Sequence, residues 1–142
     1  MTTQHRTKGK SSEAYFLYKY YDWAPNCNYT LAEHHLDSGV DFILPNNKKV
    51  QVKRFNYNRG ENQNPWRVDL RRKRNEGIGN YTADSFNFLV VHDHEGATTG
   101  RECLRWCRME DIISPKTGRV QLSTSANKMK ELIDFSVFFD NE

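Results

Sequence analysis

The sequence lacks three features that would place the protein outside the cell or in a membrane. It has only three cysteines among 142 residues, and three cannot all pair within one chain, which argues against a secreted disulfide scaffold. It has no apolar run of about 18 residues, the length that a membrane-spanning helix needs. Its basic, polar N-terminus lacks the apolar stretch of a signal peptide. We therefore expect no membrane partner and an intracellular, cytoplasmic location, with an organelle or a host nucleoid also open.

Composition and charge favour one globular domain that presents a basic face. Hydrophobic residues make up 37% of the chain and aromatic residues 13%, which is enough for a packed core and excludes a disordered protein. The net charge of +3 is modest, but ten Lys and Arg residues lie between Lys48 and Arg74, and the last twelve residues carry four acids and no base. Such a separation of charge is typical of a chain that binds a polyanion.

Turn residues and hydrophobic periodicity predict an α+β fold, an α/β sandwich with a mixed central β-sheet flanked by an N-terminal and a C-terminal helix. Residues 1–10 are expected to form a flexible basic arm, and residues 11–142 a single domain. Ser11 or Ser12 is predicted to cap a helix that ends near Trp23. The predicted strands cover residues 40–44, 49–55, 65–72 and 85–93, and the last of these is the most apolar and the central one.

The second half of the chain is predicted in less regular pieces. Residues 71–83 are expected to be a basic, Gly-containing loop, and residues 102–113 a strand that continues into a short helix. Residues 126–139 have apolar residues near helical spacing, which predicts a C-terminal helix. Its aromatic residues either join two copies of the chain or simply pack in the core.

Three polar residues in the stretch DFILPNNKKVQVKRF, Asp41, Gln51 and Lys53, form the first candidate site. Residues two apart in a strand share a face, so Gln51 and Lys53 point together to one side while Val50 and Val52 point to the other. Asp41 joins Gln51 and Lys53 only if directly opposed residues of the hairpin have an even index sum. A two- or four-residue loop centred on the Asn pair gives an odd sum, so the site requires a three- or five-residue loop or a bulge.

These residue types suit the hydrolysis of a phosphodiester. A divalent ion held by oxygen ligands neutralises the phosphate and activates a water molecule. Asp41 supplies an anionic ligand, the side-chain carbonyl of Gln51 a neutral one, and the backbone carbonyl of Val52 a third. Lys53 is placed to orient the water or to stabilise the phosphate. The alternative is an ordinary solvated hairpin face.

The pattern resembles the PD-(D/E)XK nuclease superfamily, which places a helix acid first, then an Asp, and then an acid or Gln, any residue and Lys in the next strand. Here these are Glu13, Asp41 and the triplet Gln51-Val52-Lys53, within residues 11–92. The resemblance implies a restriction-endonuclease-like core, a single nuclease-like domain, Mg²⁺ with Mn²⁺ as a substitute, and Glu13 as a second metal ligand, with Asp37 in reserve. Two departures are Val40 in place of the usual Pro and Gln51 in place of the commoner acid.

The basic middle of the chain provides candidate contacts to DNA phosphates. Each cation that displaces a counterion makes such binding salt-dependent. The candidates are Lys48, Lys49, Arg54, Arg59, Arg67, Arg71, Arg72, Lys73 and Arg74. The amide residues between positions 56 and 64 suit the reading of base edges and equally suit a polar loop. A solvated loop or a localisation signal remains the alternative for the whole segment.

One further constellation competes for a metal. His92 and His94 have the spacing of two ligands on one side of a strand, and Cys103 and Cys107 lie four apart, which together would suit zinc. The cysteines lie in an apolar stretch, so core packing is the favoured interpretation for them.

From these observations we predict a metal-dependent DNA endonuclease with Asp41, Gln51, Lys53 and Glu13 as its catalytic residues. The amide-rich segment favours a sequence-specific enzyme of the homing type, which the resemblance includes. A Holliday-junction or branched-DNA resolvase of the same fold is the alternative. A non-catalytic nucleic-acid-binding module and a structural protein are hypotheses of other classes. Because two strands need two sites, we expect a homo-oligomer, a dimer or higher.

Overall fold

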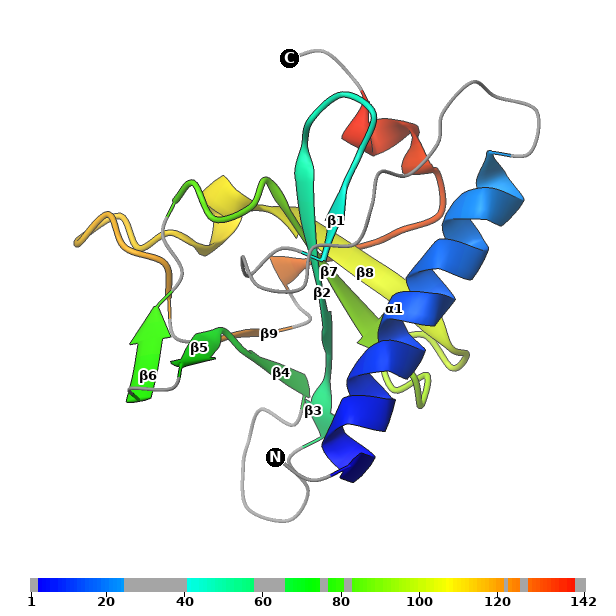
Figure 1. Cartoon of the computed structure of the whole chain (residues 1–142), viewed down its shortest axis with the longest axis horizontal. Helices are drawn as coiled ribbons and strands as arrows, with labels where there is room; N and C mark the ends of the chain where they lie inside the picture. Colours follow the sequence, from blue (N-terminus) through cyan, green and yellow to red (C-terminus); the bar gives the residue numbers. More distant parts are fainter. Residues whose placement is uncertain are drawn as a thin grey trace.

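The computed structural model describes residues 3–24, 41–57, 66–74, 77–80, 83–121, 123–125 and 128–139. One long helix, α1 (Thr3–Trp23), lies across a five-stranded sheet in the order β1-β2-β7-β8-β10 (Figure 1). Its strands are β1 (Phe42–Ile43), β2 (Lys49–Arg54), β7 (Phe88–Asp93), β8 (Cys103–Arg108) and β10 (Lys130–Glu131). β2 and β7 are parallel and the other neighbours antiparallel, so the sheet is mixed and the predicted α+β class is confirmed.

Smaller elements surround this sheet. β3 (Asn56–Tyr57), β4 (Trp66–Asp69) and β9 (Ser123–Ser125) form a three-stranded sheet, and β5 (Arg71–Arg74) pairs with β6 (Gly77–Asn80). Two 3₁₀ helices follow β8 and β10, namely η1 (Met109–Ile112) and η3 (Phe135–Phe138). No described helix has the length and apolar character needed to span a bilayer.

β7 is the central strand, as its sequence predicts. All six of its residues are buried, and it lies between β2 and β8. Because side chains alternate along a strand, Phe88 and Val90 face α1 while Leu89 and Val91 face the opposite side. A strand that is covered on both faces needs a continuous apolar sequence rather than an alternating one.

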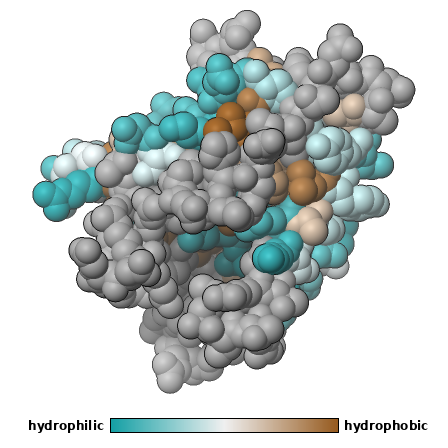
Figure 2. All heavy atoms as spheres, viewed as in Figure 1, coloured by the Kyte–Doolittle hydropathy of each residue, from teal (hydrophilic) through white to brown (hydrophobic). Residues whose placement is uncertain are grey.

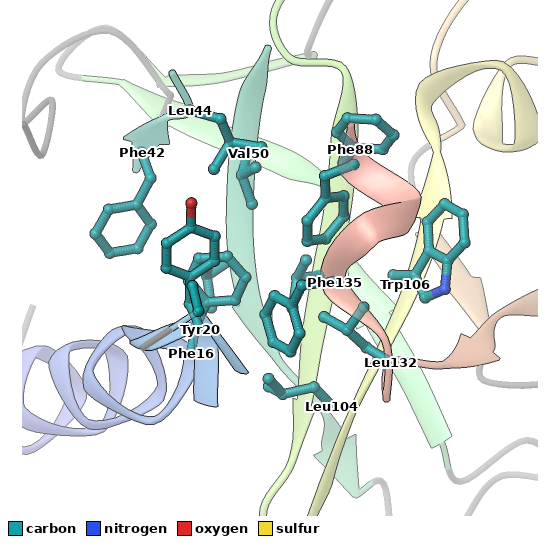
Figure 3. Close-up of a cluster of buried hydrophobic side chains, with 14 residues drawn as sticks. Phe16, Tyr20, Phe42, Leu44, Val50, Phe88, Leu104, Trp106, Leu132 and Phe135 are labelled. Atoms are coloured by element: carbon teal, nitrogen blue, oxygen red, sulfur yellow. The ribbon is translucent and has the colours of Figure 1, made fainter. Parts of the chain in front are cut away.

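The larger core fills the space between α1 and the sheet. Phe16 and Tyr20, one turn apart on α1, are fully buried against residues from β1, β2, β7 and β8 (Figure 3). Leu132 and Phe135 close this core from the C-terminal segment. In the view of Figure 2 the described surface is mainly hydrophilic with small, separate apolar patches, in keeping with this internal location of the apolar side chains.

Two predicted boundaries differ from the structure. α1 begins at Thr3 rather than at Ser11 or Ser12, so residues 3–10, expected as a flexible basic arm, continue the helix. Apart from one glycine, this stretch contains residues that a helix tolerates well, and no proline interrupts it. Residues 71–83 were expected as a loop, but β5 and β6 form an antiparallel pair within them. The strand followed by a short helix at 102–113 is confirmed by β8 and η1.

The predicted C-terminal α-helix is wrong in its local form. The segment contains β10 and η3 instead, because the Leu132 N–H donates to Leu104 O at 2.8 Å and extends the sheet edge, and the Asp134 carboxylate then caps η3 by accepting from Ser136 N at 3.0 Å. Phe135 and Phe138 are 2% and 1% exposed, so these aromatic residues pack in the core and do not form a surface for a second copy.

Candidate active site

The hairpin has the register that the candidate site requires. Phe42 is paired with Val50, so opposed residues have an even index sum. Beyond Phe42 the pairing is not continued regularly, because the Asp41 N–H donates to Val50 O at 3.1 Å, so Asp41 lies against Val50 and not opposite Gln51. The prediction of an irregular hairpin is therefore confirmed.

A three-residue turn produces this register. The Leu44 N–H donates to Lys48 O at 2.8 Å and closes the loop, and the Asn47 N–H donates back to Leu44 O at 2.8 Å. Asn47 has a φ of 69°, in the left-handed region that Asn tolerates better than most residues. The second asparagine of the turn thus provides the extra residue that shifts the pairing from odd to even.

The Asp41 side chain occupies the edge of β2 just beyond the end of β1. Its Oδ2 accepts a hydrogen bond from the Val52 N–H at 2.7 Å, a contact that replaces the missing strand partner. The N–H and C=O of one strand residue point to the same edge, so the Val52 carbonyl also lies on the Asp41 side of β2. Asp41 is half-buried, which leaves its second carboxylate oxygen room for another partner.

Glu13 of α1 is a further partner of the Asp41 carboxylate. Its side chain is hydrogen-bonded to Asp41, and its pKa is raised from 4.5 to about 7. Burial is the largest cause, followed by the negative charge of Asp41 and the hydrogen bond to it, while Lys10 acts in the opposite direction. Two carboxyl groups this close hold one proton between them, and a bound cation would take its place.

Gln51 and Lys53 lie in β2, and side-chain alternation points both to the face opposite to that of Val50 and Val52. Gln51 is 7% exposed, and its Oε1 is buried without a hydrogen-bond partner among the described residues. A buried amide oxygen without a hydrogen bond lowers the stability of the fold, and it is well suited to bind a cation. Lys53 is half-buried and two residues further along the same face. Glu13, in contrast, approaches from the α1 side, so Glu13 does not share a face of the sheet with Gln51 and Lys53.

The donor set fits a hard divalent cation. Glu13 and Asp41 contribute carboxylates in direct contact, and Gln51 Oε1 and the Val52 carbonyl are neutral oxygens, the ligand types that Mg²⁺ prefers. Within the described ranges no group of three or more His, Cys, Asp or Glu side chains is placed to hold a metal, so the two neutral oxygens are needed. Asp37, the reserve ligand, lies outside the described residues.

The zinc alternative has no such support. Both ring nitrogens of His92 are already hydrogen-bonded, to Ser12 and Glu102, and the Cys107 side chain is buried in the core on the opposite face. The pKa of the Cys107 thiol is raised to about 12, mainly by burial, which opposes the thiolate that zinc needs. Both cysteines that are described belong to the packing of β8.

The predicted DNA contacts are spread over several elements. Lys48 and Lys49 follow the turn of the hairpin and are half-buried, and Arg54 at the end of β2 donates from Nε to His94 Nδ1 at 2.9 Å. Arg67 belongs to β4, and the stretch from Arg71 to Arg74 forms β5. Arg59 lies outside the described residues.

Sequence reasoning missed a polar chain beside the carboxyl pair. Ser12 Oγ lies 2.8 Å from His92 Nδ1, and His92 Nε2 lies 2.6 Å from Glu102 Oε2. Tyr15 stacks on the His92 ring with a centroid distance of 4.5 Å. The sequence contained one signal for this contact. Ser12 lies one helical turn before Phe16 and two turns before Tyr20, so it is a polar residue on the core-facing side of the helix.

Comparison with known proteins supports the fold. No family model and no curated protein matches the chain. Among solved structures, it is similar to a bacterial homing endonuclease, I-Ssp6803I, with a TM-score of 0.51 and 19% sequence identity over 74% of this chain and 69% of that chain. At that identity the likeness bears on the fold alone.

Proposed function

We propose that this protein is a Mg²⁺-dependent DNA endonuclease of the PD-(D/E)XK type. The observation that carries the proposal is the Glu13–Asp41 carboxyl pair at the edge of β2, the strand that also carries the buried and unpartnered Oε1 of Gln51. A fold similar to that of a homing endonuclease supports the same conclusion. The amide residues between positions 56 and 64 favour sequence-specific cutting of the homing type over the resolution of branched DNA.

The residues of the site have distinct roles in this proposal. Asp41, Glu13, Gln51 Oε1 and the Val52 carbonyl hold the ion, which when bound neutralises the phosphate and lowers the pKa of a water molecule. The ammonium group of Lys53 lies on the Gln51 face, where it stabilises the extra negative charge of the phosphate in the transition state. The Val52 N–H keeps Asp41 in place through the 2.7 Å bond.

Basic residues near the site bind the DNA backbone. Lys48 and Lys49 belong to the same hairpin as Asp41. A DNA backbone that these lysines bind is therefore led along the hairpin toward the carboxyl pair. Arg54, Arg67 and the Arg71–Arg74 strand extend the contact, and each phosphate contact adds to the salt dependence of binding. Cutting both strands with one site per chain requires two chains, so we expect a dimer or a higher homo-oligomer.

Plasmid cleavage tests the proposal. Wild type, Lys53→Ala and Asp41→Ala are incubated with supercoiled plasmid and with four-way junction DNA in Mg²⁺, and Lys116→Ala, at an exposed turn, is the matched control for loss of a lysine. We expect Lys53→Ala and Asp41→Ala to lose cleavage by a factor of about 100 or more while DNA binding in Ca²⁺ is retained.

The same experiment separates the alternatives. Cutting of the junction without cutting of plasmids carrying candidate sites assigns a resolvase. Salt-dependent DNA binding by a wild-type protein that cuts neither substrate assigns a non-catalytic nucleic-acid-binding module. If wild type neither binds nor cuts DNA, the proposal is wrong and a structural role is left.

A further inference from the structure

The hydrogen-bonded chain formed by Ser12, His92 and Glu102 is a polar contact that joins the first half of α1 to the sheet. Ser12 is 1% exposed and His92 2%, and they are 80 positions apart in sequence. Glu102 precedes β8, and its Oε2 lies 2.6 Å from His92 Nε2 on the other side of the ring. The Glu102 side chain is 45% exposed. The hydroxyl of Ser12 is too deeply buried to reach a substrate, so a Ser-His-Glu arrangement here does not make a nucleophile.

The hydrogen bonds of this chain have a definite direction. Burial lowers the pKa of His92 below its ordinary value and outweighs the opposing effect of Glu102, so the ring is neutral at pH 7. The Glu102 carboxylate accepts, so Nε2 carries the hydrogen, and Nδ1 then accepts from the Ser12 hydroxyl. Each polar atom of the ring and of the Ser12 side chain is thereby satisfied.

A directional contact is needed at this place on α1. Ser12, Phe16 and Tyr20 lie on one stripe of the helix, and all three are buried against the sheet. Apolar contacts such as those of Phe16 and Tyr20 tolerate small rotations and shifts of a helix, whereas a hydrogen bond at 2.8 Å does not. Glu13 is the next residue after Ser12, so any rotation of this turn moves its carboxyl group away from Asp41.

We propose that Ser12, His92 and Glu102 position Glu13 against Asp41 and thereby set the divalent-cation affinity of the site, a role that rests on the function proposed above. They are positioning residues, because Ser12 and His92 are buried and Glu102 contacts the His92 ring. These hydrogen bonds run from Glu102, just before β8, through the His92 ring in β7 to Ser12 in α1. They therefore hold Glu13 in a fixed position relative to the sheet whose edge carries Asp41. Partners that orient metal ligands in this way typically change affinity by a factor of about 10 to 100.

Titration calorimetry with Mn²⁺ tests the role of the chain at both of its ends. Ser12→Ala removes the hydroxyl, and Ser11→Ala at the neighbouring exposed position is its matched control. Glu102→Ala removes the acceptor, and Glu102→Gln restores an acceptor oxygen at a side chain exposed enough for the fold to be kept. We expect Ser12→Ala and Glu102→Ala to weaken Mn²⁺ binding about tenfold, and Ser11→Ala and Glu102→Gln to stay within about twofold of wild type.

A second measurement needs neither metal nor activity. If Ser12 positions Glu13 against Asp41, the changes in melting temperature caused by Ser12→Ala and Asp41→Asn are non-additive. Ser11→Ala combined with Asp41→Asn is additive. Asp41→Asn keeps an oxygen for the Val52 N–H, so the hairpin itself is preserved.

The outcomes separate this inference from the proposed function. Mn²⁺ affinity that is equal in Ser12→Ala and Ser11→Ala overturns the positioning role even if wild type cuts DNA. If wild type binds no Mn²⁺, the proposed function is wrong, and the melting temperatures alone decide the rest. Non-additivity then supports the positioning of Glu13, and additivity overturns it.

Discussion

Replacing Glu13 with Gln is expected to stabilise the protein at high pH while it removes metal binding. A carboxyl group whose pKa is higher in the folded chain than in the unfolded chain binds more protons when folded. Stability therefore falls as the pH rises from 4.5 to about 7. Between these two values Glu13 is ionised in the unfolded chain and protonated in the folded chain. Above pH 7 the loss is complete, and below pH 4.5 it is absent. A Gln side chain is neutral throughout and keeps a hydrogen-bond donor for Asp41.

The size of the effect follows from the pKa. A rise from 4.5 to about 7 corresponds to at most about 3 kcal/mol of unfolding free energy at high pH. Because Glu13 is only half-buried and solvent screens its charge, we expect about 1.5 kcal/mol. For a domain of this size such a change raises the melting temperature by about 5 °C.

Urea unfolding at about pH 8 and about pH 4.5 measures the effect in the absence of divalent ions. Glu13→Gln is expected to exceed wild type at the higher pH and to equal it at the lower pH, whereas Glu110→Gln, at an exposed side chain, shows no such difference between the two conditions. Added Mn²⁺ should stabilise wild type and not Glu13→Gln, since a ligand stabilises only the state that binds it. A Glu13→Gln protein that is less stable than wild type at the higher pH would refute the account of the carboxyl pair.

Three further predictions concern single positions. Gly96 has a φ of 68°, and a Cβ there would lie 2.7 Å from the Arg101 carbonyl carbon, so Gly96→Ala is expected to lower stability by about 2 kcal/mol in urea unfolding; an unchanged midpoint would contradict this. Asn47→Gly should leave thermal stability within about 0.5 kcal/mol, whereas Asn47→Val, which resists the left-handed backbone, should lose about 1–2 kcal/mol. Cys107, with its pKa raised to about 12, should resist a thiol reagent at pH 8 in the folded protein and react in urea; fast labelling of the folded protein would exclude the buried position.

The hairpin could be predicted from the sequence in more detail than the rest of the fold. Alternation in the stretch from Lys49 to Arg54 determines which side chains share a face, and the demand that Asp41 join them determines the parity of the register. The all-apolar β7 likewise predicts its own central place. These features depend on neighbouring residues and on a period of two, which a single sequence displays directly.

Other features depend on contacts between distant parts of the chain. The C-terminal segment has apolar residues near helical spacing, but the Leu132 N–H finds a free strand edge at Leu104, and this pairing determines the local structure. The bond between Ser12 and His92 joins residues 80 positions apart, so neither residue alone reveals it. Propensity and periodicity do not report such partners, because tertiary pairing overrides local preference.

The turn of the hairpin links the fold to the candidate site. Removing one residue between Leu44 and Lys48 would change the parity of the register and move Asp41 away from the Val52 N–H, while the apolar residues of β1 would leave the core that Phe42 now enters. The core therefore selects the same register that the site needs. A carboxyl pair that lowers stability at neutral pH is tolerated because its hairpin is held by the buried side chains of Phe42, Leu44 and Val50. A preorganised cation site requires this separation of roles: apolar residues hold the register of the hairpin, and polar residues at its edge lower the stability of the fold.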